Sequence, residues 1–270
     1  MNNILEVGGL TVRVKEKRQS RTLVENVMFS VRPGRCLGIL GESGSGKSMT
    51  CKAITGLLDS SFQVSGQALF NGKKLIGMDA ETLRRIRGRE ICMILQNPMN
   101  CFDPLHRMGK QMAEGFEAHT ALPRAEVRQK CVATLENMRI RNPEEVLMKY
   151  PHQLSGGMLQ RVMIGLALIM EPKLIIADEP TTAIDSITQY SIVEELKMIK
   201  SRNGAAMIFI SHDLAVISQI ADEVIVMRDA KICQSGSVQD VMLHPTDEYT
   251  RFLIQKKKAV MQKFYQVVSA

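Results

Sequence analysis

Hydrophobic and polar residues alternate over residues 5–14 (LEVGGLTVRV), with the period of a half-buried strand. Four shorter stretches are almost continuously apolar: residues 34–40 (GRCLGIL), 90–96 (EICMILQ), 173–179 (KLIIADE) and 205–213 (AAMIFISHD). Short apolar runs bounded by glycine or charged residues are typical of strands that are buried on both faces. The pattern predicts a sheet with a buried centre.

Two further stretches complete the predicted core. Asn71-Gly72 separates two apolar-bearing arms within residues 67–76 (QALFNGKKLI), which is a strong hairpin signal. Residues 48–58 (SMTCKAITGLL) have the pattern of a helix that follows the strand at 34–40. We therefore expect an α/β fold with a mixed sheet and an antiparallel β subdomain.

The pattern changes in the middle of the chain. Helical spacing dominates from Val127 to Leu168, and strand-like runs are absent there. We predict a core formed by residues 1–96 and 171–236, with a helical lobe inserted at 97–170. Residues 237–270 are expected to form a C-terminal helical extension whose lysines are solvated.

Composition narrows the class of protein. Hydrophobic residues make up 45% and charged residues 23% of the 270 residues, as in ordinary globular proteins. With 4% aromatics and no tryptophan, few side chains could stack on single-stranded nucleic acid, and no nucleic-acid partner is expected. The net charge of +7 fits an anionic ligand, a membrane surface or simply a solvated basic face.

Other signals bear on location and metals. The longest apolar run, Val162 to Met170, is too short to span a bilayer, and the start MNNILEVGG lacks a signal-peptide pattern, so we expect a cytoplasmic chain. The six cysteines form no C-x-x-C pair and the five histidines are scattered. Metal binding by the chain's own cysteines and histidines is not expected.

Residues 41–48 (GESGSGKS) carry the most specific chemical signal. They fit G-x-x-x-x-G-K-[ST] between a predicted strand and a predicted helix. Backbone N–H groups in such a loop converge on phosphate oxygens, the lysine reaches the β- and γ-phosphates and the serine hydroxyl binds Mg²⁺. The predicted nucleotide-binding residues are Gly41, Ser43, Gly44, Ser45, Gly46, Lys47, Ser48 and Met49.

Two more motifs make an ordinary Gly/Ser-rich turn a poor explanation. In LIIADE, Asp178 and Glu179 emerge at the end of a buried strand, where they can hold Mg²⁺ through water and activate an attacking water. In LSGGMLQR, Ser155 is a predicted helix N-cap, and Gly156 and Gly157 leave backbone N–H groups open to an anion.

Together these motifs resemble the ATP-binding cassette (ABC) ATPases over essentially the whole chain. They stand in the family's order: GESGSGKS, ILQNP, LSGGMLQR, LIIADEP, TTAID and ISHD. The resemblance implies a P-loop NTPase core, the cofactors ATP and Mg²⁺, and two cassettes packed head to tail around shared nucleotides.

The resemblance also implies roles for individual residues. Glu179 is the base, His212 contacts the γ-phosphate, and Gln96 contacts Mg²⁺ and the attacking water while linking the core to the helical lobe. Asp185 couples the two sites at the dimer interface. The signature residues that act on the partner's nucleotide are Leu154, Ser155, Gly156, Gly157 and Gln160, and Mg²⁺ is held by Ser48, Gln96 and Asp178.

Two positions depart from the family pattern. Val14 stands where many cassettes have an aromatic residue that stacks on adenine, which leaves adenine stacking without its usual residue. Asp229-Ala230 stands in a hairpin whose turn usually carries glycine, so we expect modest local strain.

Within the family, the motifs and the segment HPTDEYTRFLI resemble importers of oligopeptides, nickel and metal-opine chelates. The nickel and metal-chelate branch is favoured, with a dipeptide or oligopeptide importer as the alternative. Such an ATPase has as partners a second, usually different, cassette, two transmembrane permease subunits and, indirectly, an extracytoplasmic solute-binding protein. It would lie on the cytoplasmic face of the plasma membrane.

Proteins of other classes fit less well. A soluble cassette acting on DNA or ribosomes usually has a long coiled-coil insertion or two cassettes, and this sequence shows neither. A P-loop kinase or GTPase lacks the motif LSGGMLQR. A non-hydrolysing binder would be expected to lose Glu179 or His212, and both are present here.

Overall fold

The computed structural model describes residues 3–16, 19–181 and 186–256. The chain divides into two compact units, which are described separately. Unit 1 contains residues up to Gly77 and from Ile208 onward, and unit 2 runs from Met78 to Met207. The boundary falls within strand β8 (Ala206–Ser211), which begins in unit 2 and ends in unit 1.

Unit 1 contains an antiparallel sheet in the order β2-β1-β4-β5. Its strands are β1 (Leu5–Glu16), β2 (Gln19–Val31), β4 (Phe62–Phe70) and β5 (Lys73–Lys74). The turn between β4 and β5 places Asn71 at φ 47° and Gly72 at φ 76°, which confirms the predicted hairpin.

A bulge shifts the apolar face of β1. Leu5 and Val7 are buried before it and Leu10 and Val12 are buried after it, because the register with both neighbours shifts between them. Gly9 lies in this shift at φ 60°. An extra residue in one strand reverses which alternate positions face the core, and the bulge thus keeps apolar side chains inside along the whole strand.

Unit 1 also contains the strands that lead to the predicted phosphate loop. β3 (Cys36–Leu40) is fully buried and runs parallel to β9 (Glu223–Arg228), which pairs antiparallel with β10 (Lys231–Ser237). The helices are α1 (Lys47–Ile54), α8 (Leu214–Ile220), which packs on β3, and α9 (Val238–Leu243), and residues 248–256 are also helical. Helix α1 ends before the predicted residue 58 because Gly56 adopts φ 63°.

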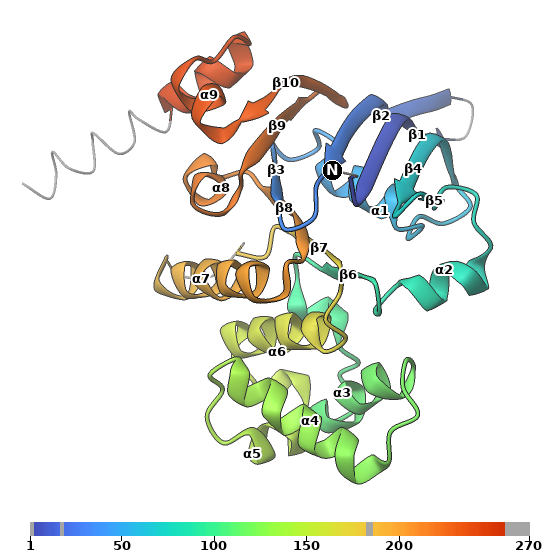
Figure 1. Ribbon diagram of the computed structural model, residues 1–270, viewed down its shortest axis with the longest axis vertical. Helices are drawn as coiled ribbons and strands as arrows, with labels where there is room; N and C mark the ends of the chain where they lie inside the picture. Colours follow the sequence, from blue (N-terminus) through green and yellow to red (C-terminus); the bar gives the residue numbers. More distant parts are fainter. Residues whose placement is uncertain (1–2, 17–18, 182–185, 257–270) are drawn as a thin grey trace, which may run out of the picture. The chain divides into compact units, whose positions relative to one another are not determined.

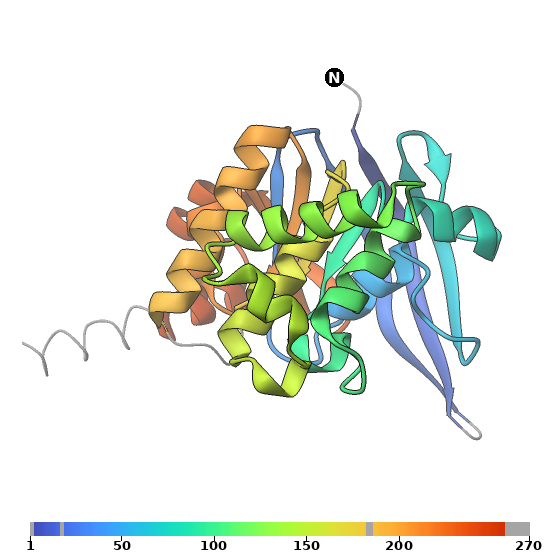
Figure 2. The same ribbon diagram turned by 90° about the horizontal axis from the view of Figure 1, so that it is seen from below.

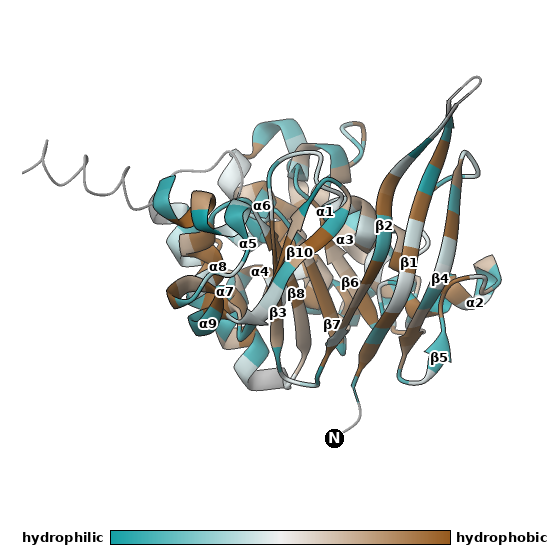
Figure 3. Cartoon of the chain, turned by 90° about the horizontal axis from the view of Figure 1, so that it is seen from above, coloured by the Kyte–Doolittle hydropathy of each residue, from teal (hydrophilic) through white to brown (hydrophobic). Residues whose placement is uncertain are grey.

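Unit 2 contains two parallel buried strands, β6 (Ile91–Ile94) and β7 (Leu174–Asp178). Hydrophobic colouring along β7 agrees with its complete burial (Figure 3). Ala206, at the start of β8, donates its N–H to the Lys173 carbonyl at 2.9 Å. The predicted strands at 90–96, 173–179 and 205–213 are confirmed.

The helices of unit 2 are, in chain order, α2 (Ala80–Ile86), the 3₁₀ turn η1 (Pro98–Cys101), α3 (Met108–Glu117), α4 (Arg124–Asn137), α5 (Pro143–Met148), the 3₁₀ turn η2 (Pro151–Gln153), α6 (Gly156–Leu168) and α7 (Ser186–Asn203). Four of them form a packed group in which α4 contacts α3, α5 and α6 (Figures 1 and 2). The predicted α/β class is thereby confirmed, whereas the predicted domain boundaries stay a prediction.

Burial keeps several thiols protonated. It raises the pKa of Cys92 to about 12, and it is also the main cause that raises the pKa of Cys131 and of Cys233 to about 11. Thiolate is the reactive form of cysteine. These three cysteines are therefore held in the unreactive thiol form.

The β9–β10 turn carries the strain expected from its sequence. Asp229 and Ala230 adopt φ 48° and 67°, although neither is glycine, and the Ala230 carbonyl accepts the Glu25 N–H at 2.8 Å. A left-handed conformation costs a non-glycine residue about 1–2 kcal/mol, so we expect Ala230→Gly to stabilise unit 1 by about 0.5–1 kcal/mol. Urea unfolding measures this change, with Ala121→Gly as the control that gives no gain. An equal or lower stability of Ala230→Gly would contradict it.

Candidate nucleotide site

The phosphate loop connects two buried elements of unit 1. β3 ends at Leu40, residues 41–46 form the loop, and α1 begins at Lys47. The Lys47 side chain is 4% exposed, and its ammonium donates to the carbonyls of Gly41 and Glu42, each at 2.8 Å. The ammonium therefore lies inside the loop, where a lysine of this motif can meet phosphate oxygens.

Two of the loop glycines are required by their protein neighbours. A Cβ on Gly41 would lie 2.3 Å from the Met227 carbonyl oxygen, and one on Gly46 would lie 2.7 Å from the Leu23 carbonyl oxygen. Gly44 has nothing within 4 Å but adopts φ 83°, which favours glycine. Packing against the backbone and backbone conformation are thus the structural reasons for glycine at these positions.

The start of α1 is suited to an anion. Gly46 caps the helix without a side-chain hydrogen bond, and no acidic residue lies in the first turn. The N–H groups and the helix dipole there favour negative charge. The Ser45 hydroxyl is buried and lacks a hydrogen-bond partner within the described residues, and Ser48 and Met49 lie in the first turn with partial exposure.

Tyr249 is a residue near this loop that sequence reasoning missed. Its hydroxyl accepts the Glu42 N–H at 3.1 Å, and the Arg228 guanidinium lies 5.0 Å from the centre of its ring. Burial raises the pKa of Tyr249, so its hydroxyl stays protonated. The sequence analysis noted this residue only within HPTDEYTRFLI, a segment that resembles importer ATPases, and that resemblance does not reveal a contact with the phosphate loop.

His212 also belongs to unit 1, directly after β8. It is exposed in the turn that leads to α8, and Asp213 caps that helix by accepting the Ala215 N–H at 2.8 Å. The Ser211 hydroxyl in turn accepts the Asp213 N–H at 2.9 Å. These bonds fix the backbone on the C-terminal side of His212.

In unit 2, two predicted catalytic residues contact each other. The Gln96 amide donates to Glu179 Oε2 at 3.1 Å. Asp178 is buried at the end of β7, and Glu179 follows it at φ 47°. A non-glycine residue in this conformation costs about 1–3 kcal/mol and is maintained only where its surroundings hold it.

The predicted signature turn caps α6. The Ser155 hydroxyl accepts the Met158 N–H at 3.3 Å, as expected for an N-cap. A Cβ on Gly156 would meet nothing within 4 Å, and one on Gly157 would lie 3.5 Å from the Thr188 side chain. Leu154 is buried, and the Gln160 amide donates to the Pro180 carbonyl at 2.7 Å. Asp185 lies outside the described residues.

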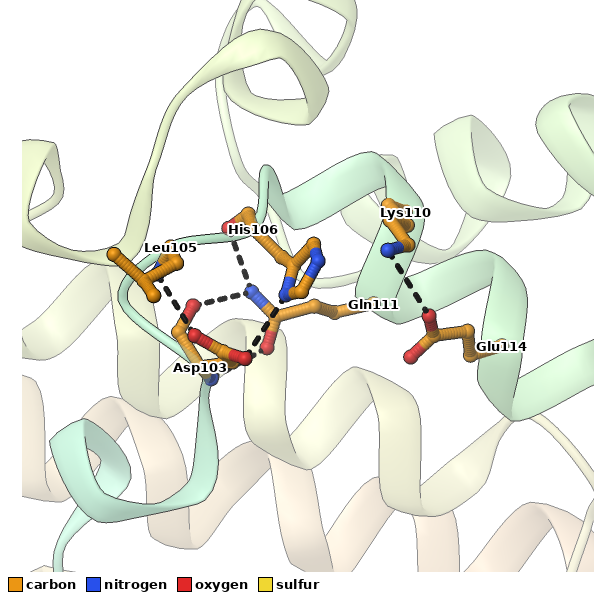
Figure 4. A network of polar contacts seen from close by, with 6 residues as sticks. All are labelled: Asp103, Leu105, His106, Lys110, Gln111 and Glu114. Atoms are coloured by element: carbon orange, nitrogen blue, oxygen red, sulfur yellow. Dashed lines mark hydrogen bonds and ion pairs between the residues drawn. The ribbon is translucent and has the colours of Figure 1, made fainter.

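A polar network fixes the segment that follows Gln96 (Figure 4). The Gln111 amide donates to the carbonyls of Asp103 and His106 at 3.0 and 2.8 Å, and its oxygen accepts the Asp103 N–H at 2.8 Å. The Asp103 carboxylate accepts the Leu105 N–H and faces His106 Nδ1, and these hydrogen bonds lower the pKa of Asp103. Leu105 is 80% exposed at the tip.

Unit 1 thus holds the phosphate loop and His212, and unit 2 holds Gln96, Glu179 and the signature turn. Across residues 3–16, 19–181 and 186–256, no group of three histidine, cysteine or acidic side chains is placed to bind a metal ion. Nor does any helix in that part of the chain have the length and apolar character needed to cross a membrane.

Comparison with known proteins identifies the family. The family model described as ABC transporter matches residues 24–182. The chain belongs to the ABC transporter family. Relatives include the metal-staphylopine import system ATP-binding protein CntD of Staphylococcus aureus strain NCTC 8325, which is 44% identical over 91% of each chain. The oligopeptide transport ATP-binding protein OppD of Salmonella typhimurium is 39% identical over 92% of this chain and 74% of its own.

Solved structures agree with this membership. A dimeric ATP-binding cassette in a post-hydrolysis state, bound to ADP and Pi, has a TM-score of 0.78 and 26% identity over 87% of this chain and 98% of its own. CbiO1 of Clostridium perfringens, with a TM-score of 0.75 and 24% identity over the whole of both chains, supports the fold. This ABC protein is an ATPase of the kind that couples ATP hydrolysis to transport.

We expect alanine at Gly44 and alanine at Gly46 to lower the free energy of unfolding by different amounts. Gly44→Ala should destabilise the protein by about 1–2 kcal/mol, because only the left-handed backbone opposes a side chain there. Gly46→Ala should cost more, because its Cβ also meets the Leu23 carbonyl. Denaturant unfolding without nucleotide measures both values. Equal costs would show that the close approach of Leu23 does not matter.

Proposed function

We propose that the chain is the ATP-hydrolysing subunit of an importer for a metal ion held by a small organic chelator. The observation that carries this proposal is the 44% identity with the metal-staphylopine import protein over 91% of both chains, compared with 39% for the oligopeptide import proteins. An oligopeptide importer is the second candidate, since those relatives match nearly as well.

The phosphate loop would hold the triphosphate of ATP. Its backbone N–H groups, the start of α1 and the Lys47 ammonium supply positive charge to phosphate oxygens, and the buried Ser45 hydroxyl can donate to one more. Lys47 exchanges its two carbonyl acceptors for phosphate oxygens when nucleotide binds.

The residues proposed for Mg²⁺ suit that ion. Ser48, Asp178 and Gln96 offer a hydroxyl, a carboxylate and an amide oxygen, and Mg²⁺ prefers oxygen ligands. The Gln96 amide nitrogen is bonded to Glu179, so its oxygen is the atom that can face a cation. When bound, Mg²⁺ neutralises charge that develops on the phosphate oxygens.

Glu179 is the proposed general base. Gln96 holds one of its oxygens, which fixes the direction of the carboxylate, and Glu179 accepts a proton as water attacks the γ-phosphate. His212 orients the γ-phosphate. Val14 lies where an adenine-stacking aromatic is common, so affinity for the nucleotide comes from the phosphate contacts.

A second cassette completes the site. Leu154, Ser155, Gly156 and Gly157 would face the partner's nucleotide, with Asp185 at the interface between the cassettes. Hydrolysis removes the γ-phosphate that holds the closed pair, so closure and opening can drive the permease subunits. We propose that the segment around Leu105 docks on a cytoplasmic helix of the permease, because its network presents an exposed apolar tip. The protein then lies on the cytoplasmic face of the membrane.

The catalytic roles lead to distinct variants. Lys47→Ala should lose nucleotide binding or hydrolysis, whereas Glu179→Gln should bind ATP and hydrolyse it roughly 10²–10⁴-fold more slowly, trapping the closed dimer. Steady-state hydrolysis and ATP binding measure the two effects. Glu144→Gln, a surface carboxylate paired with Arg128, serves as the control with the wild-type rate. Equal rates for wild type and Glu179→Gln would remove Glu179 as the base.

The substrate is tested by uptake in cells that carry wild type or Glu179→Gln. We expect uptake of radiolabelled nickel, supplied with a chelator, to collapse in the variant while uptake of a labelled dipeptide is unchanged. Nickel without chelator distinguishes the free ion from the chelate. Loss of dipeptide uptake alone would favour the oligopeptide importer and would leave the ATPase assignment intact.

A further inference from the structure

The Gln160 side chain is engaged inside its own chain. It lies in the second turn of α6, is 2% exposed, and donates to the Pro180 carbonyl at 2.7 Å. A buried carbonyl needs a hydrogen-bond partner, and a buried amide that supplies it fixes the carbonyl in place. This bond ties the helix that opens with the signature turn to the residues that follow β7.

The Pro180 carbonyl that Gln160 binds lies one residue after Glu179, whose backbone is left-handed. Glu179 adopts φ 47° immediately before Pro180, and the proline ring restricts the rotation of its own backbone. Fixing the Pro180 carbonyl therefore restricts the peptide plane that joins Glu179 to Pro180. On the side-chain end, Gln96 holds the Glu179 carboxylate at 3.1 Å. Two glutamines from different elements thus constrain one residue.

We propose that Gln160 is a positioning residue for Glu179 of its own chain, a role distinct from the contact with the partner's nucleotide that its motif implied. The inference rests on the proposed role of Glu179 as the base. The positioning role would couple the two nucleotide sites of a cassette pair. The first turn of α6 carries the groups proposed to contact the partner's nucleotide, and the second turn carries the Gln160 bond that helps to hold Glu179 of the same chain. A shift of α6 toward the partner's nucleotide changes the alignment of Glu179.

The test uses Gln160→Met and Gln160→Glu in the full chain, purified from its own cells together with its partner subunits. Both variants keep approximately the size of the side chain and lose the donor to Pro180. We expect kcat for ATP hydrolysis to fall roughly tenfold to a hundredfold, because small displacements of a catalytic group have effects of that order. KM for ATP and nucleotide affinity should hardly change, since the phosphate loop is untouched.

Gln234→Met is the matched control. Gln234 also bonds a side-chain amide to the backbone, accepting the Asp247 N–H at 3.2 Å, and lies in β10. We expect its kcat to equal that of wild type. Thermal unfolding of all three variants separates lost stability from lost alignment, and Gln160→Glu provides the measurement if Gln160→Met does not fold.

The outcomes separate the inference from the proposed function. Wild-type kcat in both Gln160 variants, or losses of kcat and nucleotide affinity in equal proportion, would overturn the positioning role. If Glu179→Gln is inactive while the Gln160 variants are active, only the positioning role fails. If Glu179→Gln retains the wild-type rate, the base assignment itself fails.

Discussion

A buried strand that ends abruptly in polar residues is the constraint on which this protein depends. β3 and β7 are buried along their whole length, and each leads directly into residues that we propose meet phosphate or water. Because their apolar side chains fix these strands in the core, the groups at their ends have little freedom to move. The site needs that rigidity, since catalysis depends on where donors and acceptors stand before the reaction starts.

Residues that follow these rigid strands adopt backbone conformations with positive φ. Glu179 lies in a left-handed conformation that few glutamates adopt, and it is held by hydrogen bonds from Gln96 and, through Pro180, from Gln160. The phosphate loop shows the opposite solution: Gly41, Gly44 and Gly46 take the unusual conformations there without a side chain to obstruct them. Glu179 cannot be glycine if its carboxylate is the base, as we propose, so its neighbours must supply the restraint.

Local patterns in the sequence were sufficient for most of the fold and, with the family resemblance, for proposing the site residues. Apolar runs predicted β3, β6, β7 and β8, and Asn71-Gly72 predicted its hairpin, because these signals depend on neighbouring residues only. The contacts of Tyr249 and Gln160 could not be predicted in the same way. Each joins a side chain to a backbone group that is distant along the chain, and no spacing or periodicity encodes such a pairing.

The pairing of β3 with β9 has a consequence for how the protein is made. Leu37 is opposite Glu223, and Tyr249 bonds to Glu42, so β3 and the proposed phosphate loop are completed by residues that lie far along the sequence. During synthesis, the phosphate loop emerges from the ribosome long before these partners. Contacts of such high sequence separation form late and slow folding. The nascent chain therefore carries this loop without its partners until Glu223 and Tyr249 have been translated.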